Sequence, residues 1–152
     1  MRCLVSFGFV ALLLAAPATA RASSLDGKPA DQDSITALEE RIGQAQPREQ
    51  CYLYAELIHQ MTEFSVQKYS AGDTQKANSL LKDVQAIAHK LHLSVGDNDK
   101  RLKNAEILLR HTAFRLNEML HNSSYEDRPL VEQTLAQVNQ AENEAMMQVF
   151  KK

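Results

Sequence analysis

The chain has 152 residues, with 17 basic and 19 acidic side chains and a formal net charge of −2. This balance excludes the basic footprint of a nucleic-acid-binding protein, and the scattered Lys and Arg side chains form no stripe for an anionic lipid surface. The length is that of one domain of ordinary size.

The first twenty residues have the pattern of a secretory signal peptide. Arg2 precedes the apolar run CLVSFGFVALLLAA, which ends at Pro17, and the small residues ATA precede a predicted cleavage site after Ala20. The run has about 14 residues, whereas a membrane-spanning helix needs about 20. We therefore expect export to the periplasm or the cell exterior. The chain left after cleavage, residues 21–152, has no second apolar run and no expected membrane span.

Cysteine usage leaves two interpretations open. Cys3 lies in the signal segment, so Cys51 is the one cysteine of the mature chain and no intramolecular disulfide can form. Either Cys51 packs as a small apolar side chain, or it forms an intermolecular disulfide in an oxidising compartment.

The mature chain begins with a polar segment and a short helix. Residues 21–33 contain Gly and Pro and lack periodicity, which predicts a flexible leader. A single all-α domain is expected over 34–152. Its first helix is predicted over 34–44, with Ile35, Leu38 and Ile42 on one side and TALE (36–39) as a capping box.

Four longer helices follow, joined by short connections. Their apolar residues recur at helical spacing, and we expect them over 47–70, 73–93, 97–122 and 127–150. Asp73 and Asp127 are the expected caps of the third and fifth helices, and DND (97–99) is expected to open the fourth. Because short connections make antiparallel neighbours, we predict an antiparallel up-down-up-down four-helix bundle with a short extra N-terminal helix.

Two Glu-x-x-His motifs raise the question of a metal site. They are AELIH (55–59) and NEMLH (117–121), and such motifs face each other in four-helix bundles that hold two metal ions. We take Leu57 and Met61, with their apolar neighbours Leu53, Tyr54 and Phe64, as the core-facing stripe of the second helix.

Geometry then argues against a shared site. Glu56 lies about 130° from the core-facing direction and His59 nearly opposite it, and Glu118 and His121 also point away from the core. Glu56 and Glu118 are separated by about 18 Å along the bundle, whereas the metals of a two-metal site are about 3.5–4 Å apart. We expect no metal site.

The remaining histidines suggest no better site. His59 and His111 lie at similar heights, but a histidine pair without an orienting carboxylate is a poor metal site. Covalent haem is excluded because no Cys-x-x-Cys-His motif exists, and no inward histidine faces Met61. We expect no cofactor. The alternative is a periplasmic metal- or haem-binding bundle that uses His59, His111 or the two Glu-x-x-His motifs.

A second line of residues on two helices is not plainly polar. On the fourth helix the line is Ile107, His111, Phe114, Glu118 and His121, and on the second it is Cys51, Ala55, His59, Thr62, Val66 and Tyr69. A solvated face seldom carries so many apolar and aromatic side chains. We therefore predict an interaction face formed by Cys51, Val66, Tyr69, Ile107 and Phe114. Either the short first helix covers it, or a second copy or another exported protein binds it.

Catalytic motifs are missing from the sequence. It contains no Gly-rich phosphate loop, no Gly-x-Ser-x-Gly and no His-Glu-x-x-His. The strings CYLYAELIHQMTE and RLKNAEILLRHTAFRLNEMLH, within residues 47–150, resemble those of small exported all-helical proteins of soil bacteria. That resemblance implies export and helices and no particular activity. We expect a non-enzymatic exported bundle that acts through protein contacts.

Overall fold

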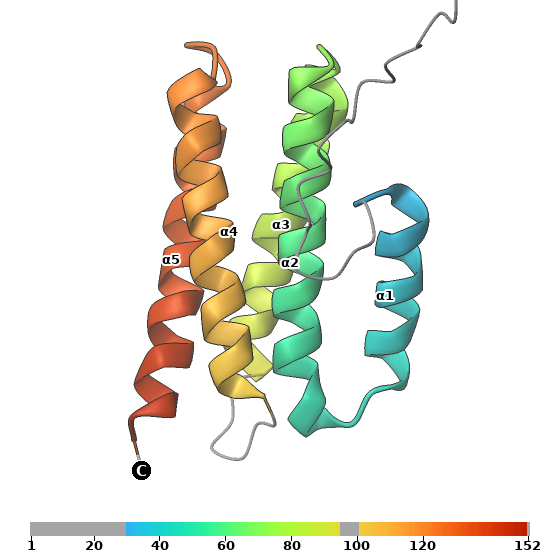
Figure 1. The fold of residues 1–152 in the computed structure, drawn as a ribbon, viewed down its shortest axis with the longest axis vertical. Helices are drawn as coiled ribbons and strands as arrows, with labels where there is room; N and C mark the ends of the chain where they lie inside the picture. Colours follow the sequence, from blue (N-terminus) through green and yellow to red (C-terminus); the bar gives the residue numbers. More distant parts are fainter. Residues whose placement is uncertain (1–29, 95–100, 152) are drawn as a thin grey trace, which may run out of the picture.

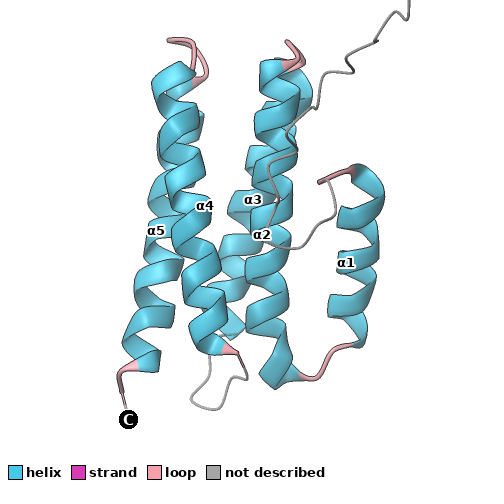
Figure 2. Ribbon diagram, viewed as in Figure 1, coloured by secondary structure: helices cyan, strands magenta, loops and turns pink. Residues whose placement is uncertain are grey.

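The computed structural model describes residues 30–94 and 101–151, which form helices and connecting loops without a strand (Figures 1 and 2). There are five helices in this part of the chain. They are α1 (Gln32–Gln44), α2 (Pro47–Ser70), α3 (Thr74–Ser94), α4 (Leu102–Asn122) and α5 (Arg128–Val149). The all-α class predicted from the sequence is confirmed. The signal segment 1–20, the leader residues 21–29 and the DND sequence (97–99) lie outside the described residues.

Helix α1 begins earlier than its apolar pattern indicates. Asp31 is the N-cap, and its Oδ1 accepts a hydrogen bond of 2.7 Å from the backbone N of Ser34. The predicted capping box at residues 36–39 is wrong, because the Thr36 hydroxyl donates instead to the backbone O of Gln32. Residues 30–33, expected to be part of the flexible leader, therefore belong to the folded domain.

The two predicted aspartate caps have different roles. Asp73 Oδ1 accepts from the backbone N of Lys76 at 3.1 Å, so it caps the first turn of α3 as expected. Gly72, with a φ of 84°, provides the left-handed backbone conformation in the turn between α2 and α3. Asp127 occupies the N-cap position of α5, but its carboxylate makes no capping hydrogen bond.

Helices α2 and α4 lie side by side and run in the same direction (Figure 1). His59 of α2 contacts Thr112 of α4, and Glu63, one turn later, contacts Arg115. The partners are separated by 53 and 52 residues, so their numbers rise together along both helices. A constant separation of this kind requires parallel helices.

Helices α3 and α5 form a second parallel pair. Asn78 contacts Asp127 at a separation of 49 residues, and His92 contacts Glu144 at a separation of 52. The bundle is thus built from two helical hairpins, α2–α3 and α4–α5, placed next to each other in the same orientation. The sequence prediction did not specify which helices are neighbours; within the described residues α3 and α4 make no contact, and the neighbours α2 and α4, like α3 and α5, are parallel.

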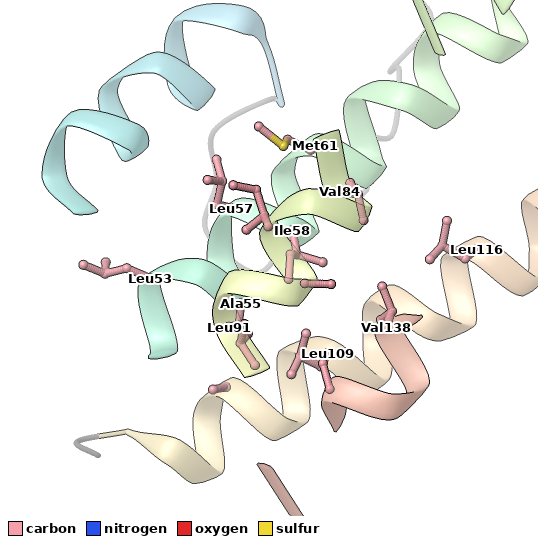
Figure 3. Packing of buried hydrophobic residues seen from close by; sticks show 14 of the residues in the cluster. Leu53, Ala55, Leu57, Ile58, Met61, Val84, Leu91, Leu109, Leu116 and Val138 are labelled. Carbon is pink, nitrogen blue, oxygen red and sulfur yellow. The ribbon is translucent and has the colours of Figure 1, made fainter. Parts of the chain in front are cut away.

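The core has two parts, one on each side of α2. Helix α1 packs against α2 through its buried residues Ile35, Leu38 and Ile42. Figure 3 places Leu53, Leu57 and Met61 on the side of α2 toward α1, and Ala55 and Ile58 on the side toward α3 and α4. All five of these α2 side chains are buried. The stripe that we took as the bundle-facing side of α2 is therefore mainly the side that α1 covers.

Candidate functional site

The part of the predicted interaction face that lies on α2 is inside the protein. Cys51 is fully buried, and Val66 and Tyr69 are partly buried against the core. Helix α4, rather than α1, covers this line, as the contact between His59 and Thr112 shows. An intermolecular disulfide at Cys51 would require the helices to separate, so the buried packing role is the one that this arrangement supports.

The part on α4 is exposed. We call Ile107, His111, Phe114, Glu118 and His121 the outer face of α4. Ile107 is 39% and Phe114 62% exposed, although both are large apolar side chains. They lie seven residues apart, which is two helical turns, so they occupy the same side of the helix. No described helix covers this side, because α1 packs against α2.

An ion-pair network fixes one edge of the outer face. Arg115 donates from Nε to Glu63 Oε1 at 2.7 Å and from Nη1 to Glu118 Oε2 at 2.6 Å. The hydrogen bond to Glu63, followed by that to Glu118, raises the pKa of Arg115 above its ordinary value, although burial opposes the shift. This network ties α4 to α2 and holds the Glu118 side chain, which remains 44% exposed, at a defined position.

The proposed metal ligands have other partners or lie apart. His59 Nδ1 is 3.0 Å from Thr112 Oγ1, and His121 Nδ1 is 2.6 Å from the backbone O of Asn117. Glu118 is bound by Arg115, and His111 is exposed.

Glu56 and Glu118 are far apart along the bundle, as expected, although the distance is somewhat smaller than predicted. The contacts between α2 and α4 put Glu56 level with about residue 108, so Glu118 lies about 15 Å further along the bundle. Within residues 30–94 and 101–151, no three His, Cys, Asp or Glu side chains come close enough together to hold a metal ion.

A groove lies between α3 and α5 on the described surface. It has a volume of about 550 Å³ and is lined by Lys82, Gln85, Ala86, Ala88, His89, His92, Gln137, Gln140, Ala141 and Glu144. In it, His92 Nδ1 lies 2.5 Å from Glu144 Oε2. A carboxylate that orients a histidine is one part of a nucleophilic site, but no Ser, Thr or Cys is among these lining residues. These lining residues therefore do not form a Ser-His or Cys-His pair.

No sequence pattern predicted the pair between His92 and Glu144. The two residues are 52 positions apart, and their contact depends on the parallel packing of α3 and α5. His92 lies in a helix whose apolar stripe faces the core, and nothing in the local spacing distinguishes it from a solvated side chain.

A polar cluster joins the tips of the two hairpins. Asp127 accepts hydrogen bonds from Asn78 Nδ2 at 2.6 Å, from Ser124 Oγ at 2.7 Å and from Tyr69 OH at 3.3 Å. Tyr69 OH also accepts from the backbone N of Ser124 at 2.7 Å. The hydrogen bond from Asn78 is the main cause that lowers the pKa of Asp127 below its ordinary value, and those from Ser124 and Tyr69 act in the same direction. This cluster has a structural role, since it fixes the α4–α5 connection to α2 and α3.

Comparisons with protein-family models, curated proteins and solved structures yield no match to this chain. None of the helices within the described ranges combines the length and the hydropathy that crossing a membrane requires. Among the described features, we take the outer face of α4 as the candidate site, because Ile107 and Phe114 are exposed on one side of a helix whose opposite side is packed in the core.

Proposed function

We propose that this protein is an exported, non-enzymatic helical bundle that acts by binding a protein surface through the outer face of α4. The observation that carries the proposal is the exposure of Phe114 and Ile107 on one side of a helix that is otherwise packed into the bundle. Scattered surface hydrophobics are ordinary, but here two large ones share one helical face. A face on a rigid helix binds without first having to be ordered, which lowers the entropic cost of association.

Export is supported by the pattern of residues 1–20 and by the resemblance to small exported helical proteins of soil bacteria. Mass spectrometry of protein recovered from the cell envelope or the medium should find a chain that begins at Arg21. A chain that retains residues 1–20 would contradict export by cleavage of a signal peptide.

For the alternative, a metal- or haem-binding bundle, residues 30–94 and 101–151 provide no cluster of three His, Cys, Asp or Glu side chains that could hold a metal ion. Its candidate ligands are spread along two helices: Glu56, His59, His111, Glu118 and His121. Of these, His59, Glu118 and His121 have other hydrogen-bond partners, and His111 is exposed. The groove between α3 and α5 contains His89, His92 and Glu144, but within the described residues these three side chains are not placed so that they could hold a metal ion.

The proposal is tested by a substitution on the face and a matched one elsewhere. Phe114→Asp places a charge in the middle of the outer face, and Tyr125→Asp makes the same kind of change at an aromatic side chain that is also exposed but lies in the α4–α5 connection. The mature protein is coupled to beads, and proteins captured from the cell envelope are identified, purified and titrated against each variant.

We expect binding of the purified partner to weaken at least tenfold with Phe114→Asp and to remain unchanged with Tyr125→Asp. Equal binding by both variants would overturn the assignment of function to this face. Circular dichroism of each variant checks that the fold is intact.

A further inference from the structure

Three residues of the outer face of α4, together with Lys103 one turn before it, have a spacing that reads the same from either end of the helix. In chain order the members are Lys103, Ile107, Phe114 and Glu118, separated by four, seven and four residues. A basic residue therefore stands one turn outside one apolar side chain, and an acidic residue stands one turn outside the other. Lys103 is exposed, and Glu118 is 44% exposed although it is bound by Arg115.

This symmetry of spacing makes the face complementary to itself. When two copies of α4 lie antiparallel with the centre between residues 110 and 111, Ile107 faces Phe114 of the second copy. At the same register, Lys103 faces Glu118 of the second copy. The apolar pair and the ion pair then each form twice in the dimer, as a two-fold interface requires.

We propose that the outer face of α4 binds the same face of a second copy of this chain, antiparallel and around a two-fold axis between Arg110 and His111. This inference rests on the proposed function and names its partner. Charge complementarity selects the partner, because a parallel pairing of the same faces would put Lys103 against Lys103 and Glu118 against Glu118.

The charges near the axis do not oppose this pairing. Arg110 lies next to the axis, but its guanidinium is held on its own chain by Glu106 through Nη2 and by Glu142, 3.5 Å from Nε. The guanidinium is therefore neutralised within each copy. His111 is exposed and lies next to the axis, level with Arg110 of the second copy.

The size of the interface sets the expected strength of the dimer. The stretch from Lys103 to Glu118 is about 22 Å long, and each copy contributes two large apolar side chains. Contacts smaller than about 1,000 Å² make weak or transient complexes. We therefore expect a reversible dimer that forms at high micromolar concentration, and its ion pairs make it sensitive to salt.

The test uses charge reversal in the mature chain, with self-association measured by sedimentation equilibrium at low salt. Lys103→Glu and Glu118→Lys should each weaken dimerisation about tenfold, because each creates two like-charge contacts per dimer. An equimolar mixture of the two variants should dimerise as the wild type does, because every pair in the mixed dimer is again of opposite charge. The matched controls are Lys90→Glu and Asp83→Lys, exposed residues of α3, and these variants should leave dimerisation unchanged alone and mixed.

A second measurement does not depend on the ion pairs or on the contact between Glu118 and Arg115. With His111→Cys, mild oxidation should link two copies through the new cysteine, while Lys90→Cys should stay unlinked; Cys51 is buried and contributes no background. A wild-type protein that stays monomeric at high concentration, or a mixture that fails to restore the dimer, would overturn the inference. In either case the titration of a captured partner with Phe114→Asp still decides the proposed function separately.

Discussion

Helices α2 and α4 are parallel neighbours of similar length, yet their surfaces differ. Helix α2 is buried on the side of Leu57, toward α1, and on the side of Ala55, toward α4. Helix α4 is buried on the side of Leu109 only, and Phe114 on its opposite side is exposed. The cause is the number of neighbours, because α2 contacts α1, α3 and α4, whereas α4 contacts only α2 and α5 among the described helices.

This difference shows how far an apolar pattern determines burial. In sequence, both helices carry a main apolar stripe and a second, mixed line at the same spacing. On α2 the second line is core, and on α4 it is surface. Spacing specifies which residues share a side of a helix, but the packing of other helices specifies whether that side is covered.

The largest expected loss of stability comes from placing a charge in the second line of residues on α2, compared with the same change in the second line on α4. Ala55→Asp buries a carboxylate between α2 and α4 without a partner, and we expect a loss of about 3–5 kcal/mol in the free energy of unfolding, or failure to fold. His111→Asp makes the corresponding change on the outer face of α4 and should alter stability by less than about 0.5 kcal/mol. Urea unfolding followed by circular dichroism measures both. Similar losses in the two variants would show that the two lines have the same environment.

A smaller loss of stability is expected when a core side chain of α1, the helix that covers α2 but not α4, is truncated. Leu38 of α1 is 4% exposed and packs toward α2, so Leu38→Ala should lower the free energy of unfolding by about 2–4 kcal/mol. The matched control is Leu93→Ala, the same truncation at a leucine that is 72% exposed, and it should cost less than about 0.5 kcal/mol. Equal stability of Leu38→Ala and the wild type would mean that α1 does not contribute to the core.

Helix positions were the most predictable part of the fold. The range 47–70 for α2 agrees with the structure, because Pro47 marks its start and the AGD turn (71–73) its end. The start of α1 was missed because Asp31 lies in a polar segment without periodicity, and its capping role depends on one hydrogen bond to the backbone of Ser34.

The side of α2 that faces the bundle was not predictable from hydropathy. The large side chains Leu57 and Met61 were taken as the centre, but the fully buried line toward α4 contains the smaller Cys51, Ala55 and Thr62. Small side chains are favoured where two helices pack closely, and a hydropathy pattern gives them little weight. The same limit applies to the candidate site, since exposure of Phe114 follows from where α1 packs and not from the residues around Phe114.

The smallest expected effect concerns the cluster that joins the two hairpins at their tips. The hydrogen bond from Asn78, with those from Ser124 and Tyr69, lowers the pKa of Asp127 in the folded protein. The ionised carboxylate therefore contributes stability above its ordinary pKa of about 3.9, and this contribution is lost as the pH falls through the lower folded value.

Replacing that carboxylate tests whether the tips hold α2 and α4 in register. Asp127→Asn should lower the free energy of unfolding at neutral pH by about 1 kcal/mol and make its fall between about pH 5 and pH 2 shallower than in the wild type. Asp83→Asn removes a carboxylate from an exposed position of α3 and should leave both quantities nearly unchanged. Urea titrations across this pH range measure the slope. If the slope of Asp127→Asn equals that of the wild type, the cluster adds no pH-dependent stability, and the register of α2 and α4 must depend on contacts such as those of Arg115 and Glu63 lower in the bundle.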